Sequence, residues 1–436
     1  MIHFSRFFAF VLSAAASLTF AANFGPAGFI YEENQVPPYT TSDPLRCQDG
    51  SLVKDVQTWE NKRRPELLEI FSREVYGRTP GGRLAGMHWE ETSVDRAALG
   101  GQAVRREITL WFTENKNGPK ARLLIYQPPG NAGKHAPWPV FLGLNFFGNQ
   151  SVANDPAITL SPAWMRPSAE FHVVENRATE KTRGVHAGRW SIETVVARGY
   201  ATATLYCGDL SEDRSEGLVR DVGALFKTKA VNERAPDEWG AIGIWAWGLS
   251  RIMDYFENDP ELDASRVAVH GHSRLGKAAL WAGAQDPRFA LVISNNSGCG
   301  GAALSKRIFG ETVQRINGSF PFWFAVNFRN YNGREDKLPI DQHELIGLIA
   351  PRPVYVASAQ EDRWADPKGE YLGAKLSEPV YALYGKTGLG VKEMPALHYP
   401  VHGDGLAYHL RAGKHDINTY DWTRYLDYAD RVLKKP

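Results

Sequence analysis

The chain has 436 residues, of which 43% are hydrophobic and 23% are charged. This composition excludes a disordered or fibrous protein and allows one large core. Because 50 Lys and Arg balance 49 Asp and Glu without long runs of one sign, neither nucleic acid nor a membrane surface is expected as a partner.

The chain begins with the features of a secretory signal peptide. Arg6 precedes an apolar run at 7–18, and small residues follow at Ala21 and Ala22. This run is too short to span a bilayer. We expect residues 1–22 to be removed and the mature chain to be exported to the periplasm or the medium, with an N-terminal amphipathic helix as the alternative.

Residues 23–100 are rich in Pro and turn residues and predict an N-terminal wrap over a core, with one helix over about 56–76. Strand patterns begin at 104–112 and 121–128, which suggest an antiparallel pair.

From there, short apolar runs alternate with helical stretches, which predicts βαβ units and a buried parallel sheet. The runs are WPVFLGLN, YATATLY, RVAVHGHS, FALVISN and PRPVYVAS. An antiparallel start followed by such units is typical of the α/β-hydrolase fold, with a mostly parallel central sheet between helices, over 101–436. The aromatic-rich stretch 298–349 is expected to cap a cleft, with a surface subdomain as the alternative.

Cys47, Cys207 and Cys299 allow at most one disulfide. Cys207 and Cys299 follow strands that end at the same edge of the predicted sheet and could meet there. Unpaired buried thiols are the equal alternative.

The stretch VHGHSRLGKAALWAGAQ, residues 269–285, predicts a strand, a tight turn and a helix with Ser273 at the apex. In such a turn the helix N-terminus faces the reacting carbonyl group. Gly271 and Gly276 relieve crowding, although Leu275 occupies the usual place of the second glycine. We interpret Ser273 as a nucleophile, with a helix cap as the alternative.

A serine nucleophile needs a histidine base and an acid that orients it, and in this fold they follow the serine in the order acid, then histidine. The loop after PRPVYVAS offers Glu361, Asp362 and Asp366, of which Asp362 is preferred. His415, between a strand at about 406–411 and the C-terminal helix, is the predicted base.

Three further histidines near the C-terminus, His398, His402 and His409, are expected to be structural. No HExxH motif occurs, and His398, His402 and Asp404 lack a clear ligand geometry. We therefore predict neither a metal nor another cofactor.

Two donors are candidates for stabilising an oxyanion. Arg274 follows the serine directly and can donate a charge-assisted hydrogen bond, with a first-turn salt bridge as the alternative. A backbone N–H from Asn145 to Gly148 is the second candidate.

The strings GHSRLGKAAL, SNNSGCGGAALSKRIFGET, EDRWADPKGE and LRAGKHDINTYDW resemble the glucuronoyl esterases, carbohydrate esterase family 15, and the bacterial members in particular. The resemblance covers most of the chain from about Ala22 to Pro436. It implies a serine esterase that cleaves the ester between lignin alcohols and 4-O-methylglucuronic acid side groups of glucuronoxylan. We expect the enzyme to be a monomer. Ser273, His415 and Arg274 match the family's nucleophile, base and oxyanion arginine.

The resemblance also implies that Lys277 and Glu311 hydrogen-bond the sugar hydroxyls and that Trp364 lies beside the glucuronoyl ring; a surface ion pair is the alternative for the first two. Asn296 departs from the fungal pattern, which has a glutamate there as the acid. Because an amide cannot stabilise an imidazolium as a carboxylate does, the departure supports Asp362.

Two other functions remain open at this stage. Another carbohydrate esterase, such as an acetyl xylan esterase, would share the fold. An exported sugar-binding protein without turnover would require a broken triad, whereas Ser273, Asp362 and His415 are all chemically competent.

Overall fold

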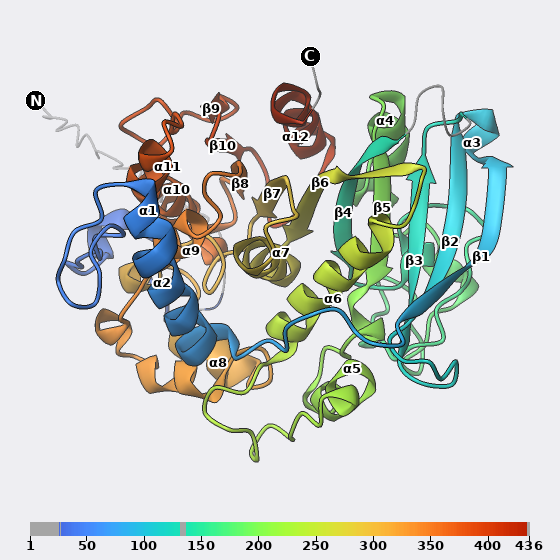
Figure 1. Ribbon diagram of the computed structural model, residues 1–436, viewed down its shortest axis with the longest axis horizontal. Helices are drawn as coiled ribbons and strands as arrows, with labels where there is room; N and C mark the ends of the chain where they lie inside the picture. The colour runs from blue at the N-terminus through green and yellow to red at the C-terminus, as the bar shows by residue number, and fades with distance from the viewer. Residues whose placement is uncertain (1–25, 27, 131–136, 434–436) are drawn as a thin grey trace, which may run out of the picture.

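The computed structural model describes residue 26, residues 28–130 and residues 137–433, so the expected signal peptide lies outside the described residues. Within them, the chain forms a ten-stranded sheet of order β1-β2-β3-β5-β4-β6-β7-β8-β10-β9 (Figure 1). The strands are β1 His88–Ala97, β2 Ala103–Trp111, β3 Lys120–Gln127, β4 Trp138–Asn145, β5 Ala201–Tyr206, β6 Leu262–His272, β7 Leu291–Asn295, β8 Val354–Ala359, β9 Val401–His402 and β10 Leu406–Arg411.

Helices cover both faces of this sheet (Figure 1). They are α1 Val56–Thr58, α2 Arg64–Phe71, α3 Ala98–Gly101, α4 Ile192–Ala197, α5 Asp221–Leu225, α6 Ala241–Phe256, α7 Arg274–Gln285, α8 Val313–Ser319, α9 Gln342–Gly347, α10 Pro367–Leu376, α11 Glu378–Leu383 and α12 Thr419–Val432.

The sheet is antiparallel from β1 to β5 and parallel from β5 through β4, β6, β7 and β8 to β10, with β9 antiparallel at the far edge. The predicted α/β-hydrolase fold with an antiparallel start is therefore confirmed. Because the parallel strands point the same way, the loops after β6, β7, β8 and β10 meet at one edge of the sheet.

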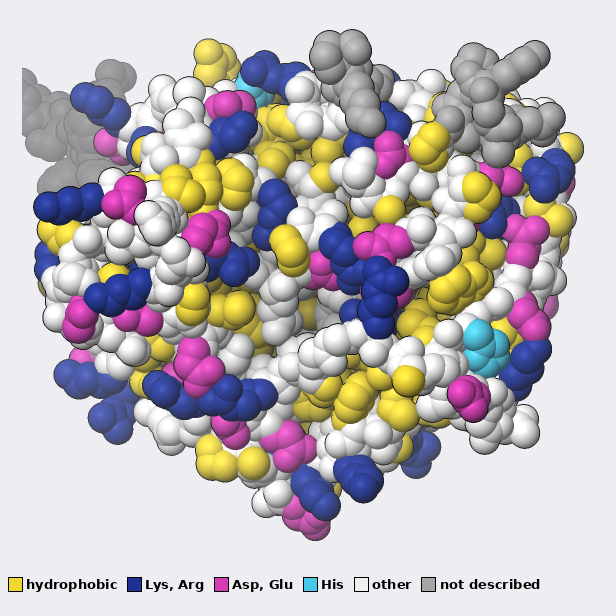
Figure 2. Space-filling model, in the orientation of Figure 1, with side chains coloured by type: hydrophobic (Ala, Val, Ile, Leu, Met, Phe, Trp, Pro, Cys, Tyr) yellow, Lys and Arg dark blue, Asp and Glu magenta, His cyan; other side chains and the backbone are white. Residues whose placement is uncertain are grey.

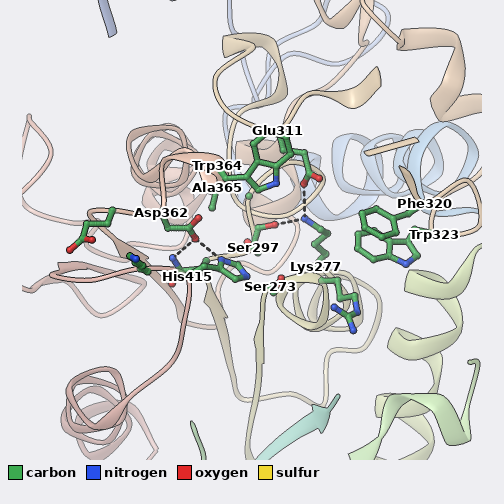
Figure 3. A pocket seen from close by; sticks show the side chains of 15 residues that line it. Ser273, Lys277, Ser297, Glu311, Phe320, Trp323, Asp362, Trp364, Ala365 and His415 are labelled. Carbon is green, nitrogen blue, oxygen red and sulfur yellow. Dashed lines mark hydrogen bonds and ion pairs between the residues drawn. The ribbon is translucent and has the colours of Figure 1, made fainter. Parts of the chain in front are cut away.

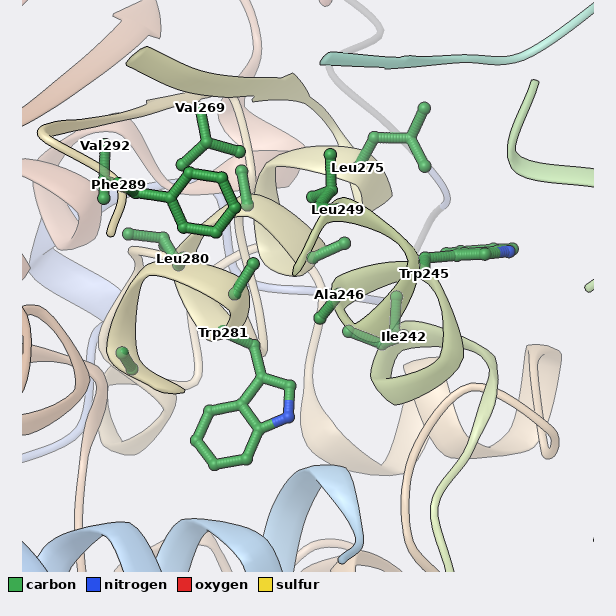
Figure 4. Close-up of a cluster of buried hydrophobic side chains, with 14 of the residues drawn as sticks. Ile242, Trp245, Ala246, Leu249, Val269, Leu275, Leu280, Trp281, Phe289 and Val292 are labelled. Atoms are coloured by element: carbon green, nitrogen blue, oxygen red, sulfur yellow. The ribbon is translucent and has the colours of Figure 1, made fainter. Parts of the chain in front are cut away.

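Side chains along the parallel strands alternate between two apolar layers. In β6, Val267 and Val269 belong to the layer of α6 and α7, whereas Ala268 belongs to the layer that α12 covers. Figure 4 shows the first layer, with Leu249 of α6 and Leu280 of α7 around Val269. Each fully buried Val or Leu contributes about 1.5–3 kcal/mol relative to an exposed one.

Strand β1 is an edge strand that the sequence analysis assigned to the N-terminal wrap. Its residues HWEETSVDRA are mostly exposed, so they carry no alternating apolar signal. An ion pair of 2.6 Å between Arg106 of β2 and Glu91 ties β1 to the sheet. The helix expected at 56–76 is a continuous helical run, with π-helical turns at Trp59–Arg63 and Ser72–Tyr76.

The stretch 298–349 is part cleft and part core. Glu311, Phe320 and Trp323 line a cavity described below, whereas α9 is fully buried against α7 and α10. The stretch therefore forms one wall of the cleft rather than a separate lid.

Cys47, Cys207 and Cys299 are free and buried, so the alternative of unpaired thiols holds. Burial raises the pKa of the Cys207 thiol, which makes it a weak nucleophile. Basic and acidic side chains are interspersed over the face in Figure 2. None of the helices in the described part of the chain has the length and apolar character needed to cross a membrane.

Candidate active site

Ser273 occupies the turn between β6 and α7 with φ 58° and ψ −132°. Residues with a side chain rarely adopt such a conformation, and it concentrates at functional sites. A Cβ on Gly271 would lie 2.1 Å from the carbonyl oxygen of Leu275, so only glycine fits there. A Cβ on Gly276 would lie 3.0 Å from the Cβ of Ser297 in the loop after β7. Gly276, which stands one residue later than the usual second glycine, therefore lets α7 pack closely against that loop.

The side chain of Ser273 makes no hydrogen bond that would cap α7. It lines a cavity of about 640 Å³ at the carboxyl edge of the parallel strands. Seven of the site residues predicted from the sequence line this same cavity, namely Ser273, Arg274, Lys277, Glu311, Asp362, Trp364 and His415.

His415 and Asp362 form a hydrogen-bonded pair in the cavity (Figure 3). His415 Nδ1 lies 2.6 Å from Asp362 Oδ2, and the Nδ2 of Asn296 donates to the same oxygen at 2.7 Å. The side chain of Asp362 is 3% exposed, whereas that of His415 is 42% exposed. The Asn296 amide therefore supports a carboxylate that comes from the loop after β8.

The other two acids of that loop have different surroundings. Glu361 is exposed at the cavity rim. Asp366 is buried, accepts from the backbone N–H of Gly369 at the start of α10, and pairs with Arg307 at 2.8 Å. Burial raises the pKa of Asp366 to about 6. Neither contacts His415 in the described interactions.

The other three described histidines near the C-terminus, His398, His402 and His409, do not line the cavity. His409 is buried in β10, 2.9 Å from Asp421 Oδ1, and burial lowers its pKa. His398 Nε2 accepts from the backbone N–H of Ala412 at 2.9 Å. His402 is exposed on β9.

The loop that carries His415, residues 412–416, is called the base loop. Arg411, which is 2% exposed, donates to the carbonyl oxygens of Ala412, Lys414 and Asp416, on both sides of His415. Its Nε donates to the buried carboxylate of Asp421 at 2.8 Å. One planar guanidinium therefore fixes the backbone of the whole base loop.

His272, directly before the nucleophile, is a neighbour of His415 that sequence reasoning missed. Its ring centroid lies 4.5 Å from that of His415, and its Nδ1 lies 2.7 Å from the side-chain oxygen of Asn295. Burial holds the pKa of His272 well below its usual value. The predicted base therefore has an uncharged aromatic neighbour.

Asp213 and Phe146 position the Arg274 guanidinium. Arg274 Nη2 lies 3.1 Å from Asp213 Oδ2, and its guanidinium carbon lies 4.5 Å from the ring centre of Phe146. Asp213 also accepts from Trp323 Nε1 at 2.8 Å. Arg274 Nε itself is buried and finds no partner among the described residues, whereas the side chain as a whole is 24% exposed and lines the cavity.

The second oxyanion donor expected in the loop after β4 is not placed in the cavity. Of the residues that the structure describes, none from Asn145 to Gly148 lines it. The Asn145 side chain is instead bonded to Asn149 at 2.8 Å and to Thr204 at 3.1 Å.

Lys277, Glu311 and Trp364 lie together on another wall of the cavity (Figure 3). The Lys277 ammonium donates to the carbonyl oxygens of Ser297 and Cys299 and lies 3.9 Å from Glu311 Oε2. The backbone N–H of Glu311 donates to the carbonyl oxygen of Trp364 at 3.0 Å. Burial raises the pKa of Glu311. This wall offers a donor, an acceptor and an aromatic face, the groups that bind a sugar.

Phe320 and Trp323 form an aromatic wall that the sequence analysis did not single out. Their rings are stacked with centroids 3.7 Å apart, on the side of the cavity away from His415 (Figure 3). The aromatic run NGSFPFWFAVNF in the expected cap was the available signal, but it does not say which rings reach the cavity.

Comparison with known proteins gives consistent relatives over nearly the whole chain. A family model for fungal glucuronyl esterases matches residues 179–385. A carbohydrate esterase, MZ0003, from an unknown prokaryotic organism is 48% identical over 411 residues, which is 94% of this chain and 93% of the relative.

Two solved structures are similar along the same length. A promiscuous esterase of carbohydrate esterase family 15 from a marine bacterial metagenome is 47% identical with a TM-score of 0.86, covering 93% of this chain and 100% of that one. A glucuronoyl esterase from Solibacter usitatus is 46% identical with a TM-score of 0.85, covering 92% and 100%. The chain therefore belongs to carbohydrate esterase family 15, the glucuronoyl esterases.

Proposed function

We propose that this esterase hydrolyses the ester between lignin alcohols and (4-O-methyl-)glucuronic acid side groups of glucuronoxylan. The observation that carries the proposal is the placement of Lys277, Glu311 and Trp364 in one cavity with Ser273. An acetyl group would leave this polar and aromatic wall without a partner. The signal peptide expected at 1–22 would deliver the enzyme to such extracellular polymers.

In the first step, Ser273 attacks the uronoyl carbonyl carbon and His415 takes the proton of the hydroxyl. Asp362, at 2.6 Å, orients His415 and stabilises the imidazolium. The Arg274 guanidinium and the N-terminus of α7 stabilise the oxyanion. The protonated His415 then gives its proton to the leaving alcohol, which leaves an acyl group on Ser273.

In the second step, His415 deprotonates a water molecule, which attacks the acyl-enzyme and releases the uronic acid and Ser273. The 42% exposure of the His415 side chain supports a position of the leaving alcohol at the open side of the cavity. A bulky alcohol can therefore leave directly to solvent, while recognition is concentrated on the sugar.

The substrate preference can be tested with two esters and two isosteric variants. Glu311→Gln should lower kcat/KM for methyl glucuronate by about 10- to 100-fold, because charged hydrogen bonds to sugar hydroxyls contribute about 1.5–3 kcal/mol. Hydrolysis of 4-nitrophenyl acetate should fall far less. Glu361→Gln, at the exposed rim of the same cavity, is the matched control.

A wild-type preference for the acetate ester over methyl glucuronate would instead favour the acetyl xylan esterase alternative. Binding of glucuronate without turnover of either ester would favour the sugar-binding alternative. Equal losses on both esters in Glu311→Gln would contradict a role in sugar recognition.

The Arg411 contacts give a separate prediction about the base loop. Arg411→Lys keeps the charge but cannot bond several carbonyl groups at once, so His415 should lose its position. We expect kcat to fall about 10- to 100-fold with KM nearly unchanged, since small misplacements of catalytic groups cost this much. Arg198→Lys, whose ion pairs with Asp427 and Asp430 lie outside the base loop, is the control. Parallel changes in KM and kcat would contradict the prediction.

A further inference from the structure

The first described residues of the chain reach the wall of the cavity that carries Glu311 and Trp364. Residues 29–33 are called the rim segment. The carbonyl oxygen of Ile30 accepts from the backbone N–H of Gly310 at 2.8 Å, and that of Tyr31 accepts from Arg363 Nη1 at 2.9 Å. The rim segment is therefore bonded to the residues immediately before Glu311 and before Trp364.

Two aromatic rings of the rim segment pack on Trp364. The Phe29 ring meets Trp364 edge to face, with centroids 5.1 Å apart and planes at 85°. The Tyr31 ring lies 6.5 Å from Trp364 at 39°, and 6.4 Å from Phe309. Such aromatic pairs have defined geometry and each contribute about 0.5–1.5 kcal/mol. They restrict the orientation of the Trp364 indole.

The carboxylate of Glu33 joins Arg307, which precedes the loop of Glu311, to Lys368 in α10, which follows the loop of Trp364. It accepts from Arg307 Nη2 at 2.6 Å and from Lys368 Nζ at 2.8 Å. The Arg307 side chain is 2% exposed and that of Glu33 is 45% exposed, so the bridge runs from a buried guanidinium to the surface.

The two loops also approach each other at a glycine. Gly310 has φ +62°, and a Cβ there would lie 2.4 Å from the carbonyl oxygen of Trp364. The rim segment binds the other side of the same glycine through Ile30. Three chain segments that are far apart in sequence therefore meet edge to edge beside the cavity.

We propose that the rim segment is a positioning element that holds Trp364 and Glu311 for sugar recognition and so sets the preference for uronoyl over small acyl esters. The proposal rests on the proposed function. Phe29 and Tyr31 do not line the main cavity, so they act through Trp364 and not as catalytic residues.

The test compares Phe29→Ala/Tyr31→Ala with the wild type on methyl glucuronate and 4-nitrophenyl acetate. The double variant should lower kcat/KM for the glucuronate ester about tenfold, equivalent to about 1.4 kcal/mol, mainly through KM. Acetate hydrolysis reports on folding and on the triad and should change by less than about twofold, since the pairs removed contact neither. Tyr399→Ala, which removes a tyrosine that is 65% exposed, is the control.

Hydrogen exchange of the backbone at residues 361–370 gives a readout that needs no substrate. Exchange there should be faster in the double variant and unchanged in Tyr399→Ala. Glu33→Gln, a milder change that removes one charge from the bridge, should lower the glucuronate kcat/KM about threefold and serves if the double variant fails to fold.

Equal losses on both esters, or no loss on the glucuronate ester, would overturn the positioning role. If the wild type shows no preference for the glucuronate ester, the proposed function fails instead. The hydrogen-exchange measurement does not depend on the substrate. If the exchange rate at residues 361–370 is the same in the double variant and the wild type, the rim segment does not hold the loop of Trp364.

Discussion

Replacing Ser273 by Ala should lower kcat for glucuronoyl esters by about 10⁴- to 10⁶-fold, the range seen when a triad nucleophile is lost. The reason is that no other hydroxyl lies at the strained turn with φ 58° at the N-terminus of α7. Residual hydrolysis would come from Arg274 and from binding alone. Steady-state turnover of methyl glucuronate measures the effect.

The fold should survive this substitution, because alanine keeps a Cβ in the same backbone conformation and Ser273 has no cap bond to lose. The melting temperature should therefore stay within a few degrees of the wild type. The variant should still bind glucuronate, which calorimetry can measure. An active Ser273→Ala variant would remove Ser273 from the mechanism altogether.

The parallel part of the fold was predictable because its strands are buried on both faces. Alternate residues of β6 enter two different apolar layers, so the run VAV is apolar throughout and stands out in the sequence. Strand β1 has the opposite character. An ion pair between Arg106 and Glu91 ties it to β2, and its charged, exposed residues give no apolar periodicity that could be detected.

The site was predictable where topology orders the residues along the chain. The loops after β6, β8 and β10 meet at one sheet edge, which singled out Ser273, Asp362 and His415 before any contact was known. Contacts between distant segments carry no such local signal. The bond from Asp213 to Arg274 and the bonds of Arg411 to the base loop depend on tertiary packing, so the sequence could not reveal them.

Asp362→Asn should lower kcat by about 10³- to 10⁴-fold, because the amide cannot stabilise the imidazolium and can hold the wrong tautomer of His415. The existing geometry strengthens this expectation. Asn296 already donates to Asp362 Oδ2 at 2.7 Å, so that oxygen must accept from both Asn296 and His415. If the new asparagine turned its NH₂ group toward Asn296 and His415, three hydrogen-bond donors would face one another with no acceptor among them.

Glu361→Gln is the matched control, since it removes a carboxylate from the neighbouring exposed position and should change kcat by less than about twofold. A large loss in this control together with an active Asp362→Asn would place the acid at Glu361. Turnover of methyl glucuronate at saturating concentration separates the two outcomes.

Asn296→Glu in the Asp362→Asn background tests whether the acid can move to residue 296, where the resemblance implies a glutamate in fungal enzymes. Asn296 lies directly beside residue 362 in the cavity, so a glutamate there has the reach to approach His415. We expect kcat to recover at least about tenfold, because an orienting carboxylate again faces the imidazole.

In the wild-type background the same change, Asn296→Glu, places two carboxylates together, which raises the pKa of one of them. Asn296→Glu alone should therefore lower activity at acidic pH, whereas the double variant should not. No recovery in the double variant would mean that only the loop after β8 delivers an acid in the correct geometry.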